Sequence, residues 1–476
     1  MPAIALASPI YVTDSNDADY TGACTSTCTI RDAVDEVNAS SGDSTIVLTV
    51  DSFLTRTGTD DTNLFGDLDL CKPVPGRKVT IIGNDYAITW ASSVLKTNRD
   101  RVIHVVDQSA TGCYPVELIL DNVHIGHGYV SGQADGGAGI ASHGPLTIIG
   151  ASVAANELVN STWSATGPGG GAIQAFDSLY LTGGVNISQN EVTQGNGGAV
   201  EARGDLTIDG AFISGNSLFG PGYGAGVRVF GPTVTASIGT AIIGSNHAGS
   251  QGGGLWADVD KLTVWNVDLV GNASANGAGA FIHLPRGQGS DPLFDRSALT
   301  ENNASLDGGG LVLVGSAEQT VSIVNTTISS NTGDTPSIYL AGGNFQLDLI
   351  HATITRNENP SGDYFVAEHN GSTTVTWFGS LIDGRCRGSG TFASLGYSVI
   401  ATGSLCPMGG TGDTIWGSPF GVNPLSVLAL GQTRHHLLGS FLEADNRVPP
   451  SVCSPEDQVG ATRPMGPACE SGSIER

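Results

Sequence analysis

Short hydrophobic runs alternate with polar positions along this chain, and between residues 145 and 357 they follow a repeating order. One run is of the Leu-Thr-Ile kind, a second ends at an asparagine, and a third follows a cluster of glycines. Alternation of apolar and polar residues over a few positions is typical of β-strands. The asparagines that mark the repeat recur every 26 to 34 residues. They are Asn156, Asn190, Asn216, Asn246, Asn272, Asn302, Asn331 and Asn357.

Self-similarity at this period indicates a repeat architecture rather than a series of globular domains. Three short strands in each repeat predict an all-β chain folded as a right-handed parallel β-helix, with coils of about 26 to 34 residues. Leucine-rich repeats would show a different pattern of Leu and Asn. We therefore expect equivalent positions of neighbouring coils to stack about 4.8 Å apart.

The recurrent asparagines fit a structural role in this stack. An Asn at the same bend of every coil can point inward and hydrogen-bond to its own turn and to the Asn of the next coil. A catalytic or glycosylation role is the less favoured alternative. Glycine clusters, such as residues 169–171 and 252–254, are expected to supply positive φ angles and close contact between coils.

One helical pattern lies near the N-terminus, where Thr29 and Asp32 have the spacing of a capping box. An apolar stripe at helical spacing is formed by Ile30, Ala33, Val34 and Val37. Because the end of a solenoid exposes unpaired strand edges, we expect this short helix to cap the first coil.

The positions at which the regular repeat begins and ends also predict the domain organisation. Residues 1–9 are expected to be a signal-peptide remnant or a disordered start. Residues 10–115 would form the N-terminal cap and irregular first coils, and residues 116–385 the regular β-helix. Residues 386–476, punctuated by Pro, Gly and Cys, would form a C-terminal cap or anchor-like region.

Charge excludes some partners, because 45 acidic residues against 20 basic ones give a net charge of −25. Such a field repels phosphate polymers and anionic bilayers, so no nucleic acid partner is expected. No apolar run is long enough for a transmembrane segment. Both ends of the solenoid are predicted to be capped, which favours a monomer over a self-assembling filament.

All eight cysteines lie in the two flanks of the chain. A zinc site would need close paired ligands, which this spacing does not provide, so disulfides are favoured. The predicted pairs are Cys24 with Cys28, Cys71 with Cys113, Cys386 with Cys406, and Cys453 with Cys469. Disulfides imply an oxidising compartment and thus a secreted or cell-surface protein.

No cofactor is expected, although the sequence leaves room for Ca²⁺. Four aspartates share one loop of the first coils: Asp60, Asp61, Asp67 and Asp69. Their spacing is not that of an EF-hand, and a solvated acidic loop is favoured. The neighbouring pairs His124 with His127 and His435 with His436 lack the carboxylates of a metal site, and a structural or surface role is expected.

Residues 28–33 read Cys-Thr-Ile-Arg-Asp-Ala and are followed by Val37-Asn38. This segment resembles the CSLREA motif of secreted bacterial right-handed parallel β-helix proteins, with departures at its second, third and fifth positions. Residues 66–70 and 100–104 are similar to family segments that follow the motif.

At the other end, residues 453–475 resemble the choice-of-anchor Q region of the same proteins. The similar positions are Asp457-Gln-Val-Gly460, Arg463-Pro464, Ala468-Cys469 and Gly472, preceded by Asn423-Pro-Leu425 and His436-Leu-Leu-Gly-Ser440. Residues 441–445 depart from the usual Pro-Ala-Ile-Asp. The resemblance implies an extracellular or cell-surface β-helix, and it implies no catalytic residues because its motifs are end features.

Candidate chemistry lies on the outward positions of the strand that follows the glycines. The first outward row is predicted to hold Gln174, Glu201, Arg228 and Trp256. The second is predicted to hold His143, Phe176, Arg203, Phe230 and Asp258. The catalytic candidates are Glu201, Arg203, Arg228 and Asp258, and the substrate-binding candidates are Trp256 and Gln174.

In a glycan cleft, Trp256 would serve as a platform for a sugar ring, the arginines would face a uronate, and Glu201 and Asp258 would be an acid and base pair. Two coils separate those carboxylates, about 9.6 Å by backbone stacking, which is closer to an inverting than a retaining geometry. The favoured alternative is a solvated face of cross-coil ion pairs.

Two functional hypotheses follow. The preferred one is an extracellular or cell-surface β-helix protein with a structural, adhesive or glycan-binding role and a polysaccharide or cell-surface partner. The alternative is a polysaccharide lyase or glycoside hydrolase acting at a lateral face. The sequence contains no nucleophile elbow, P-loop, dinucleotide fingerprint or paired-His zinc helix, and the fold alone does not choose between the two hypotheses.

Overall fold

The structure is a computed structural model. It describes residues 8–17, 24, 27–59, 63–107, 113–132, 135–160, 164, 167, 169–284, 293–315, 319–342, 344–362, 365–370, 373–417, 422–426, 432–438 and 444–475. Most of the predicted signal remnant, residues 1–7, and the loop aspartates Asp60 and Asp61 lie outside the described residues. The chain divides into two compact units, residues 1–230 and 231–476, which are described one at a time.

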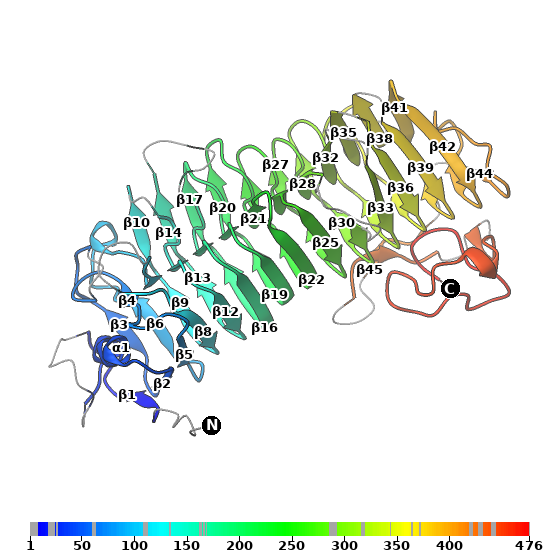
Figure 1. The fold of residues 1–476 in the computed structure, drawn as a ribbon. Helices are drawn as coiled ribbons and strands as arrows, with labels where there is room; N and C mark the ends of the chain where they lie inside the picture. Colours follow the sequence, from blue (N-terminus) through cyan, green and yellow to red (C-terminus); the bar gives the residue numbers. More distant parts are fainter. Residues whose placement is uncertain are drawn as a thin grey trace. The chain divides into compact units, whose positions relative to one another are not determined.

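Unit 1 is a parallel β-helix built from three kinds of sheet (Figure 1). Its long sheet contains β1 (Ile10–Val12), β2 (Ser44–Leu48), β3 (Ser52–Leu54), β5 (Lys78–Ile82), β6 (Ala87–Trp90), β8 (Glu117–Asp121), β9 (His124–Gly126), β12 (Leu146–Ile149), β13 (Ser152–Ala154), β16 (Leu179–Ser188) and β19 (Leu206–Ser214). Its lateral sheet contains β4 (Leu68–Leu70), β7 (Ile103–Val105), β11 (Ile140–Ser142), β15 (Ile173–Ala175), β18 (Val200–Ala202) and β21 (Val227–Phe230). Its short sheet contains β10 (Tyr129–Ser131), β14 (Glu157–Val159), β17 (Glu191–Thr193) and β20 (Ser217–Phe219).

The coils of unit 1 stack in register. In the lateral sheet Ile140 pairs with Ile173, which pairs with Val200, and in the long sheet Leu146 pairs with Leu179. These side chains are buried, and removing apolar surface from water stabilises the stack by roughly 25 cal/mol per Å². Because side chains alternate along a strand, each inward row is flanked by outward rows. The predicted right-handed parallel β-helix is confirmed.

The asparagines form the expected internal ladder. In unit 1, Asn156 Nδ2 donates to Asn190 Oδ1 at 3.0 Å, and Asn190 Nδ2 donates to Asn216 Oδ1 at 2.9 Å. In unit 2 the same bonds link Asn246, Asn272, Asn302, Asn331 and Asn357 in order. The left-handed backbone belongs to the residue before each Asn, as at Gln189 with φ 56°. The structural role predicted for the asparagines is confirmed.

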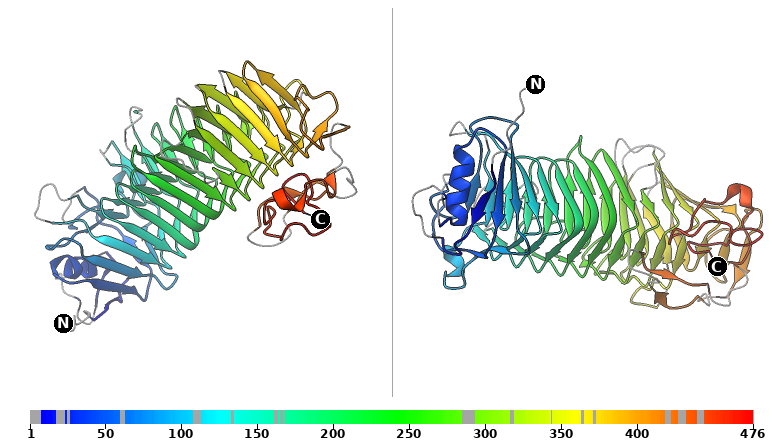
Figure 2. Two further views of the ribbon diagram at one scale, coloured as in Figure 1. Left: turned by 45° about the vertical axis from the view of Figure 1, so that its right-hand side comes forward. Right: turned by 90° about the horizontal axis from the view of Figure 1, so that it is seen from below.

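The helix α1 (Ile30–Ala39) packs against β1, β2 and β4 at the first coils (Figure 2). The Thr29 hydroxyl accepts a hydrogen bond from the backbone N–H of Asp32, and the Asp32 carboxylate accepts one from the backbone N–H of Thr29. Reciprocal bonds of this kind satisfy two donors at a helix start. The predicted capping box and helix are therefore confirmed.

Arg31 ties this helix to the coils beside it. Its guanidinium pairs with the Asp17 carboxylate at 2.8 Å and donates to the backbone carbonyls of Asn63, Gly66 and Asp67. Both members of the ion pair are buried. Arg31 thus holds the helical cap in place on the first coils.

Unit 2 is also a parallel β-helix. Its long sheet contains β22 (Thr235–Gly244), β25 (Lys261–Trp265), β26 (Asp268–Val270), β29 (Phe294–Asp295), β30 (Ala298–Thr300), β33 (Thr320–Val324), β34 (Thr327–Ser329), β36 (Gln346–Ile350), β37 (Thr353–Thr355), β39 (Thr374–Phe378), β40 (Leu381–Ile382), β42 (Thr391–Gly396), β43 (Val399–Ala401) and β44 (Thr414–Trp416). Its lateral sheet contains β24 (Leu255–Asp258), β28 (Ala280–His283), β32 (Leu311–Gly315), β35 (Ile338–Gly342), β38 (Phe365–Asn370) and β41 (Arg385–Gly388). Its short sheet contains β23 (His247–Ala248), β27 (Ala273–Ser274) and β31 (Asn303–Ala304).

The C-terminal segment, residues 432–438 and 444–475, lies along the outer face of strands β26, β30, β34 and β37 in unit 2 (Figure 2). It includes β46 (His435–His436), which pairs antiparallel with β45 (Leu425–Ser426), and a short 3₁₀ turn at Pro450–Val452. This cover explains why β30 and β34 are buried at every position. The outward residues of these strands are therefore part of a second, polar interior.

The structure contains the four predicted disulfides. They are Cys24–Cys28 and Cys71–Cys113 in unit 1, and Cys386–Cys406 and Cys453–Cys469 in unit 2. No cysteine of the chain is left free. The regular coils between residues 114 and 385 contain no cysteine, so they are held by packing and hydrogen bonds alone.

Candidate functional site

The lateral sheet of unit 1 carries most of the residues singled out from the sequence. Its strands align Asp69, His104, Ala141, Gln174, Glu201 and Arg228 in one outward row. The predicted register of Gln174, Glu201 and Arg228 is confirmed. Parallel stacking brings polar side chains of neighbouring coils within hydrogen-bonding distance.

Glu201 lies at the centre of a polar network. Its Oε1 accepts hydrogen bonds from Gln174 Nε2 at 3.0 Å and from Arg203 Nε at 2.9 Å. Its Oε2 accepts from Arg228 Nη1 at 2.7 Å. Arg203 Nη2 also donates to the carbonyl of Gly167 at 3.0 Å. Two guanidinium groups therefore pair with one carboxylate.

The predicted exposure of this row is wrong. Gln174 and Glu201 are 0% exposed, and Arg228 is 2% exposed. Glycine-rich turns cover the row, because the N–H of Gly136 donates to Gln174 Oε1 at 2.6 Å and Gly169 packs directly on the Glu201 carboxylate. A Cβ at residue 169 would lie 2.2 Å from Glu201 Oε2, so only glycine permits this approach.

Aromatic rings complete the cover. The Arg203 guanidinium lies 4.9 Å from the Phe176 ring and 5.6 Å from the Phe230 ring, and the Arg228 guanidinium lies 3.9 Å from Phe230. Contacts of this kind are stabilised by the ring quadrupole. Burial lowers the pKa of Arg228, and the charge of Glu201 opposes this shift. Both rings are thus occupied by guanidinium groups of the protein.

Trp256 and Asp258 belong to β24 in unit 2. Trp256 is only 6% exposed, its Nε1 donates to Gln251 Oε1 at 3.2 Å, and its ring meets the edge of His283 at 5.6 Å. The predicted open aromatic platform is therefore wrong, because neighbouring side chains cover the indole. Asp258 is half-buried at the end of its strand.

The first coils of the lateral sheet in unit 1 bury two of the loop aspartates, so a solvated loop is wrong for Asp67 and Asp69. Asp67 Oδ2 lies 3.1 Å from Arg101 Nε. Asp69 Oδ1 lies 3.1 Å from His104 Nδ1, and its Oδ2 accepts from the N–H of Asn63. Burial and the charge of Asp69 raise the pKa of Asp67 well above its usual range, and Arg101 acts against them.

Two histidines and a third aspartate meet beside this pair. One ring nitrogen each of His104 and His143 and one carboxylate oxygen of Asp135 lie within 4.8 Å of one another. His143 Nε2 is 3.0 Å from Asp135 Oδ2, and the His143 ring stacks on Phe176 at 4.1 Å with an interplanar angle of 6°. Burial alone would raise the pKa of Asp135, but the hydrogen bond with His143 and nearby cationic groups lower it overall.

This cluster of His104, Asp135 and His143 was missed by sequence reasoning. The repeat register places His143 in the second outward row, and its extension toward the N-terminus would add His104 to the first. Asp135 lies in a turn, and no hydrophobic pattern predicts where a turn runs. The signal was therefore partial, because His104 lies on β7 and His143 directly follows β11, and the repeat sets the register of these two strands.

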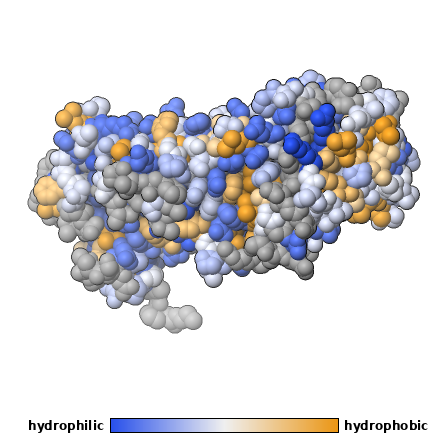
Figure 3. All heavy atoms as spheres, turned by 90° about the horizontal axis from the view of Figure 1, so that it is seen from above, coloured by the Kyte–Doolittle hydropathy of each residue, from blue (hydrophilic) through white to orange (hydrophobic). Residues whose placement is uncertain are grey.

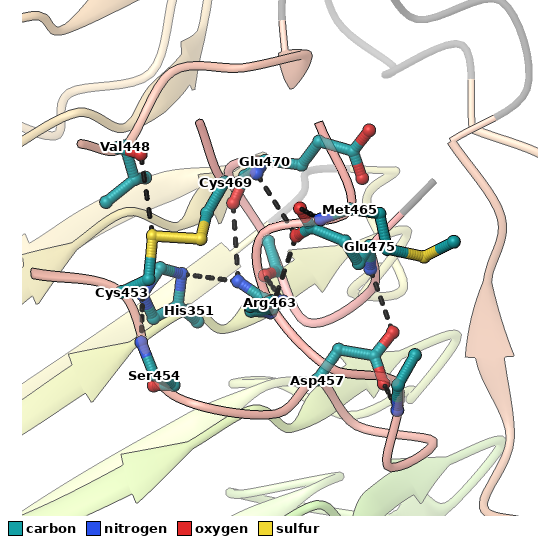
Figure 4. A network of polar contacts seen from close by, with 12 residues as sticks. His351, Val448, Cys453, Ser454, Asp457, Arg463, Met465, Cys469, Glu470 and Glu475 are labelled. Atoms are coloured by element: carbon teal, nitrogen blue, oxygen red, sulfur yellow. Dashed lines mark hydrogen bonds and ion pairs between the residues drawn. A yellow bond between two sulfur atoms is a disulfide. The ribbon is translucent and has the colours of Figure 1, made fainter. Parts of the chain in front are cut away.

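A second polar cluster lies under the C-terminal segment of unit 2 (Figure 4). Arg463 donates to the carbonyl of Gly472 and to His351 Nδ1, each at 2.8 Å, and its Nε lies 3.5 Å from the Glu475 carboxylate. Asp457 accepts hydrogen bonds from the backbone, including that of Glu475. Burial, together with the charge of Arg463, lowers the pKa of His351 to about 3. The cluster fixes the turns of the segment.

Gln458 and His436 bind this segment to the β-helix. Gln458 Oε1 accepts from the hydroxyl of Thr327 at 2.6 Å, and its Nε2 donates to the carbonyl of Ser297 at 3.0 Å. His436 Nε2 lies 2.7 Å from the hydroxyl of Ser329, and burial lowers the pKa of His436 to about 4. Gln458 and His436 thus hold the C-terminal segment against the coils of unit 2.

Unit 2 also has an open groove beside its short sheet, lined by both polar and apolar residues. Its volume is about 260 Å³, and its lining includes Asn303, Thr332, Asp334 and Glu358. Asn303, Thr332 and Glu358 occupy matching positions of successive coils, and all four side chains are exposed. The Thr332 hydroxyl donates to Asn303 Oδ1 at 2.9 Å. This groove presents hydrogen-bonding groups to solvent, unlike the closed network around Glu201.

Hydrophobic and hydrophilic residues are interspersed over the face drawn in Figure 3. Among the described residues, no helix has both the length and the apolar character needed to cross a bilayer. Comparisons with protein-family models, with curated proteins and with solved structures each returned no match.

Proposed function

We propose that this chain is an extracellular or cell-surface β-helix protein that binds glycans without chemical turnover. The observation that carries the proposal is the groove of unit 2, where Asn303, Thr332 and Glu358 stand in a row along successive coils. Sugar hydroxyls both donate and accept hydrogen bonds, and amide, hydroxyl and carboxylate side chains match both roles. A repeating row suits a repeating polymer.

The charge of the groove selects among glycans. Asp334 and Glu358 are acidic, and the whole chain carries a net charge of −25. Like charges repel across a binding surface. The preferred ligand class is therefore a neutral polysaccharide rather than a uronate polymer.

Four disulfides support the extracellular location, because such bonds persist in oxidising compartments. The burial of Glu201 supports a binding role over the lyase or hydrolase alternative. A general acid or base must reach the substrate directly or through one water, whereas Glu201 is 0% exposed and paired with Arg203 and Arg228.

A glycan array followed by affinity electrophoresis on neutral and uronate polysaccharides would test the proposal. We expect retardation by at least one neutral polysaccharide, weakened at least several-fold in the double variant Asn303→Ala and Glu358→Ala. Asp260→Ala is the matched control, because Asp260 lies in unit 2 and does not line the groove. A sugar-release assay on the same panel should find no new reducing or unsaturated ends.

Two outcomes would count against the proposal. If the double variant binds as the unmodified chain does, the groove is not the binding site. Release of sugar ends that is abolished by Glu201→Gln would instead establish the catalytic alternative.

A further inference from the structure

We propose that His104, His143 and Asp135 in unit 1 bind a divalent transition-metal ion of the zinc class. This site lies on the lateral sheet of unit 1, and it is independent of glycan binding in the groove of unit 2. The ligands come from β7, from the residue after β11, and from the turn that precedes β11. Two neighbouring coils and one turn would therefore be tied together by a single ion.

The distances fit a metal site. The three ligand atoms lie within 4.8 Å of one another, and His143 Nε2 is 3.0 Å from Asp135 Oδ2. Zn–N and Zn–O bonds of about 2.0–2.1 Å in a tetrahedron place ligand atoms roughly 3.4 Å apart. Only small side-chain movements are needed to reach that separation, and the ion would replace the proton shared by His143 and Asp135.

The histidines are held as metal ligands usually are. A metal-bound His commonly donates its other N–H to a carboxylate, which fixes the ring and raises its basicity. Asp69 Oδ1 lies 3.1 Å from His104 Nδ1, so Nε2 of His104 would be the metal ligand. Asp69 is itself fixed by the N–H of Asn63 at 3.0 Å, and the ring of His143 is fixed by stacking on Phe176.

The surrounding charge favours a cation. Asp69 and Asp135 place two carboxylates at the histidines, whereas the guanidinium of Arg101 lies beside Asp67 and Asp100, at 3.1 Å and 3.9 Å. The alternative trio of Asp67, Asp69 and His104 is less suited to an ion, because Arg101 already pairs with one of its carboxylates.

The ligand types identify the ion. Two imidazoles and one carboxylate suit Zn²⁺ and related transition metals, whereas Ca²⁺ and Mg²⁺ prefer oxygen ligands throughout. Three protein ligands leave one position for water or a bound group, as in open zinc sites. Asp135 and His143 are half-buried, so this position would be reached from solvent.

The test is binding of Zn²⁺ and Co²⁺ to the whole protein after treatment with EDTA and dialysis. We expect one ion per chain by elemental analysis, a higher Tm with Zn²⁺ than without, and visible Co²⁺ absorption. His143→Ala should weaken binding at least tenfold and abolish the Co²⁺ bands. Asp69→Asn, which keeps all three ligands, should weaken binding by roughly tenfold or more.

His124→Ala is the matched control, because His124 is exposed on β9 of the same unit and belongs to no cluster of ligands found among the described residues. It should leave binding unchanged. The proposal is overturned if the protein retains no ion, if His143→Ala binds as the unmodified chain does, or if His124→Ala loses as much affinity. Equal Tm values of the metal-free His143→Ala variant and metal-free protein would show that the variant is folded.

Discussion

At the scale of the residue, the chemistry of a charged side chain depends on what surrounds it. Glu201, Arg203 and Arg228 have the residue types of a catalytic site, yet their charges are directed at one another inside the protein. His104 and His143 show the reverse case, since strand register and a nearby turn bring their rings and the carboxylate of Asp135 together in one cluster. Neither arrangement follows from residue type alone.

The first prediction concerns Glu201. Glu201→Ala should lower the free energy of unfolding by about 3–5 kcal/mol, because it removes the carboxylate from a buried pair and leaves the charge of Arg228 in place. Urea unfolding of the variant and the unmodified chain would measure this difference. Glu191→Ala is a control at a half-buried acidic position in the same unit. A change of less than about 0.5 kcal/mol in Glu201→Ala, the value typical of surface sites, would contradict the buried network.

At the scale of the element, the C-terminal segment binds to strands of unit 2 through neutral histidines. His351 and His436 each contribute a ring that the fold keeps uncharged, with pKa values of about 3 and about 4. Arg463 donates to His351, and Ser329 contacts His436. Protonation of either ring in the folded state would therefore weaken the contact between the segment and the strands.

A pH prediction follows from those pKa values. Above pH 6.5, the ordinary histidine pKa, both rings are neutral in the folded and the unfolded chain. As pH falls from 6.5 toward 4, the unfolded chain binds protons and the folded chain does not, so each histidine lowers stability by up to about 1.4 kcal/mol per pH unit. Burial raises the pKa of Asp268 to about 6, and its protonation in the folded state partly opposes this loss.

Urea unfolding at pH 7 and pH 4.5 would measure the effect in the unmodified chain and in His436→Gln. The variant should lose less stability over this range than the unmodified chain. His247→Gln, at an exposed histidine of the same unit, should behave as the unmodified chain. An identical loss of stability in all three proteins would contradict the role given to His436.

At the scale of the whole molecule, covalent and non-covalent stabilisation are segregated. Disulfides occur only in the flanks, while the regular coils are held by hydrophobic rows, the asparagine ladders and backbone pairing. A solenoid gains stability from contacts between neighbouring repeats. Cross-links are therefore needed chiefly where the repeat stops.

The prediction at this scale concerns the disulfide Cys453–Cys469, whose cysteines are 16 residues apart. Closing a loop of this length stabilises the folded state by roughly 3 kcal/mol, because it lowers the entropy of the unfolded chain. Replacing both cysteines with serine should make residues 444–475 open at lower urea concentrations, as measured by hydrogen exchange. The β-sheet signal in circular dichroism should be retained, because the regular coils contain no cysteine. Met465→Ala, at an exposed position of the same segment, is the control. Loss of the entire β-sheet signal would contradict this segregation.

Much of the architecture could be predicted because each repeat encodes its own local structure. The asparagine period, the Thr29 and Asp32 cap and the cysteine pairs are all local or periodic features, and each is confirmed. The register of Gln174, Glu201 and Arg228 also follows from the period. The exposure of that row could not be predicted, because glycine turns from other coils fold over it.

The sequence by itself determined the parallel β-helix, its ladder and its cross-links, since hydrophobic period and spacing act between neighbouring coils. Only the tertiary structure decided which outward residues meet solvent. Burial depends on the paths of the turns and of the C-terminal segment, and the repeat period does not determine these paths. Whether a charged side chain is reactive or inert depends in turn on its burial. For the same reason the cluster of His104, Asp135 and His143 emerged from the fold, where residues from two coils and a turn meet.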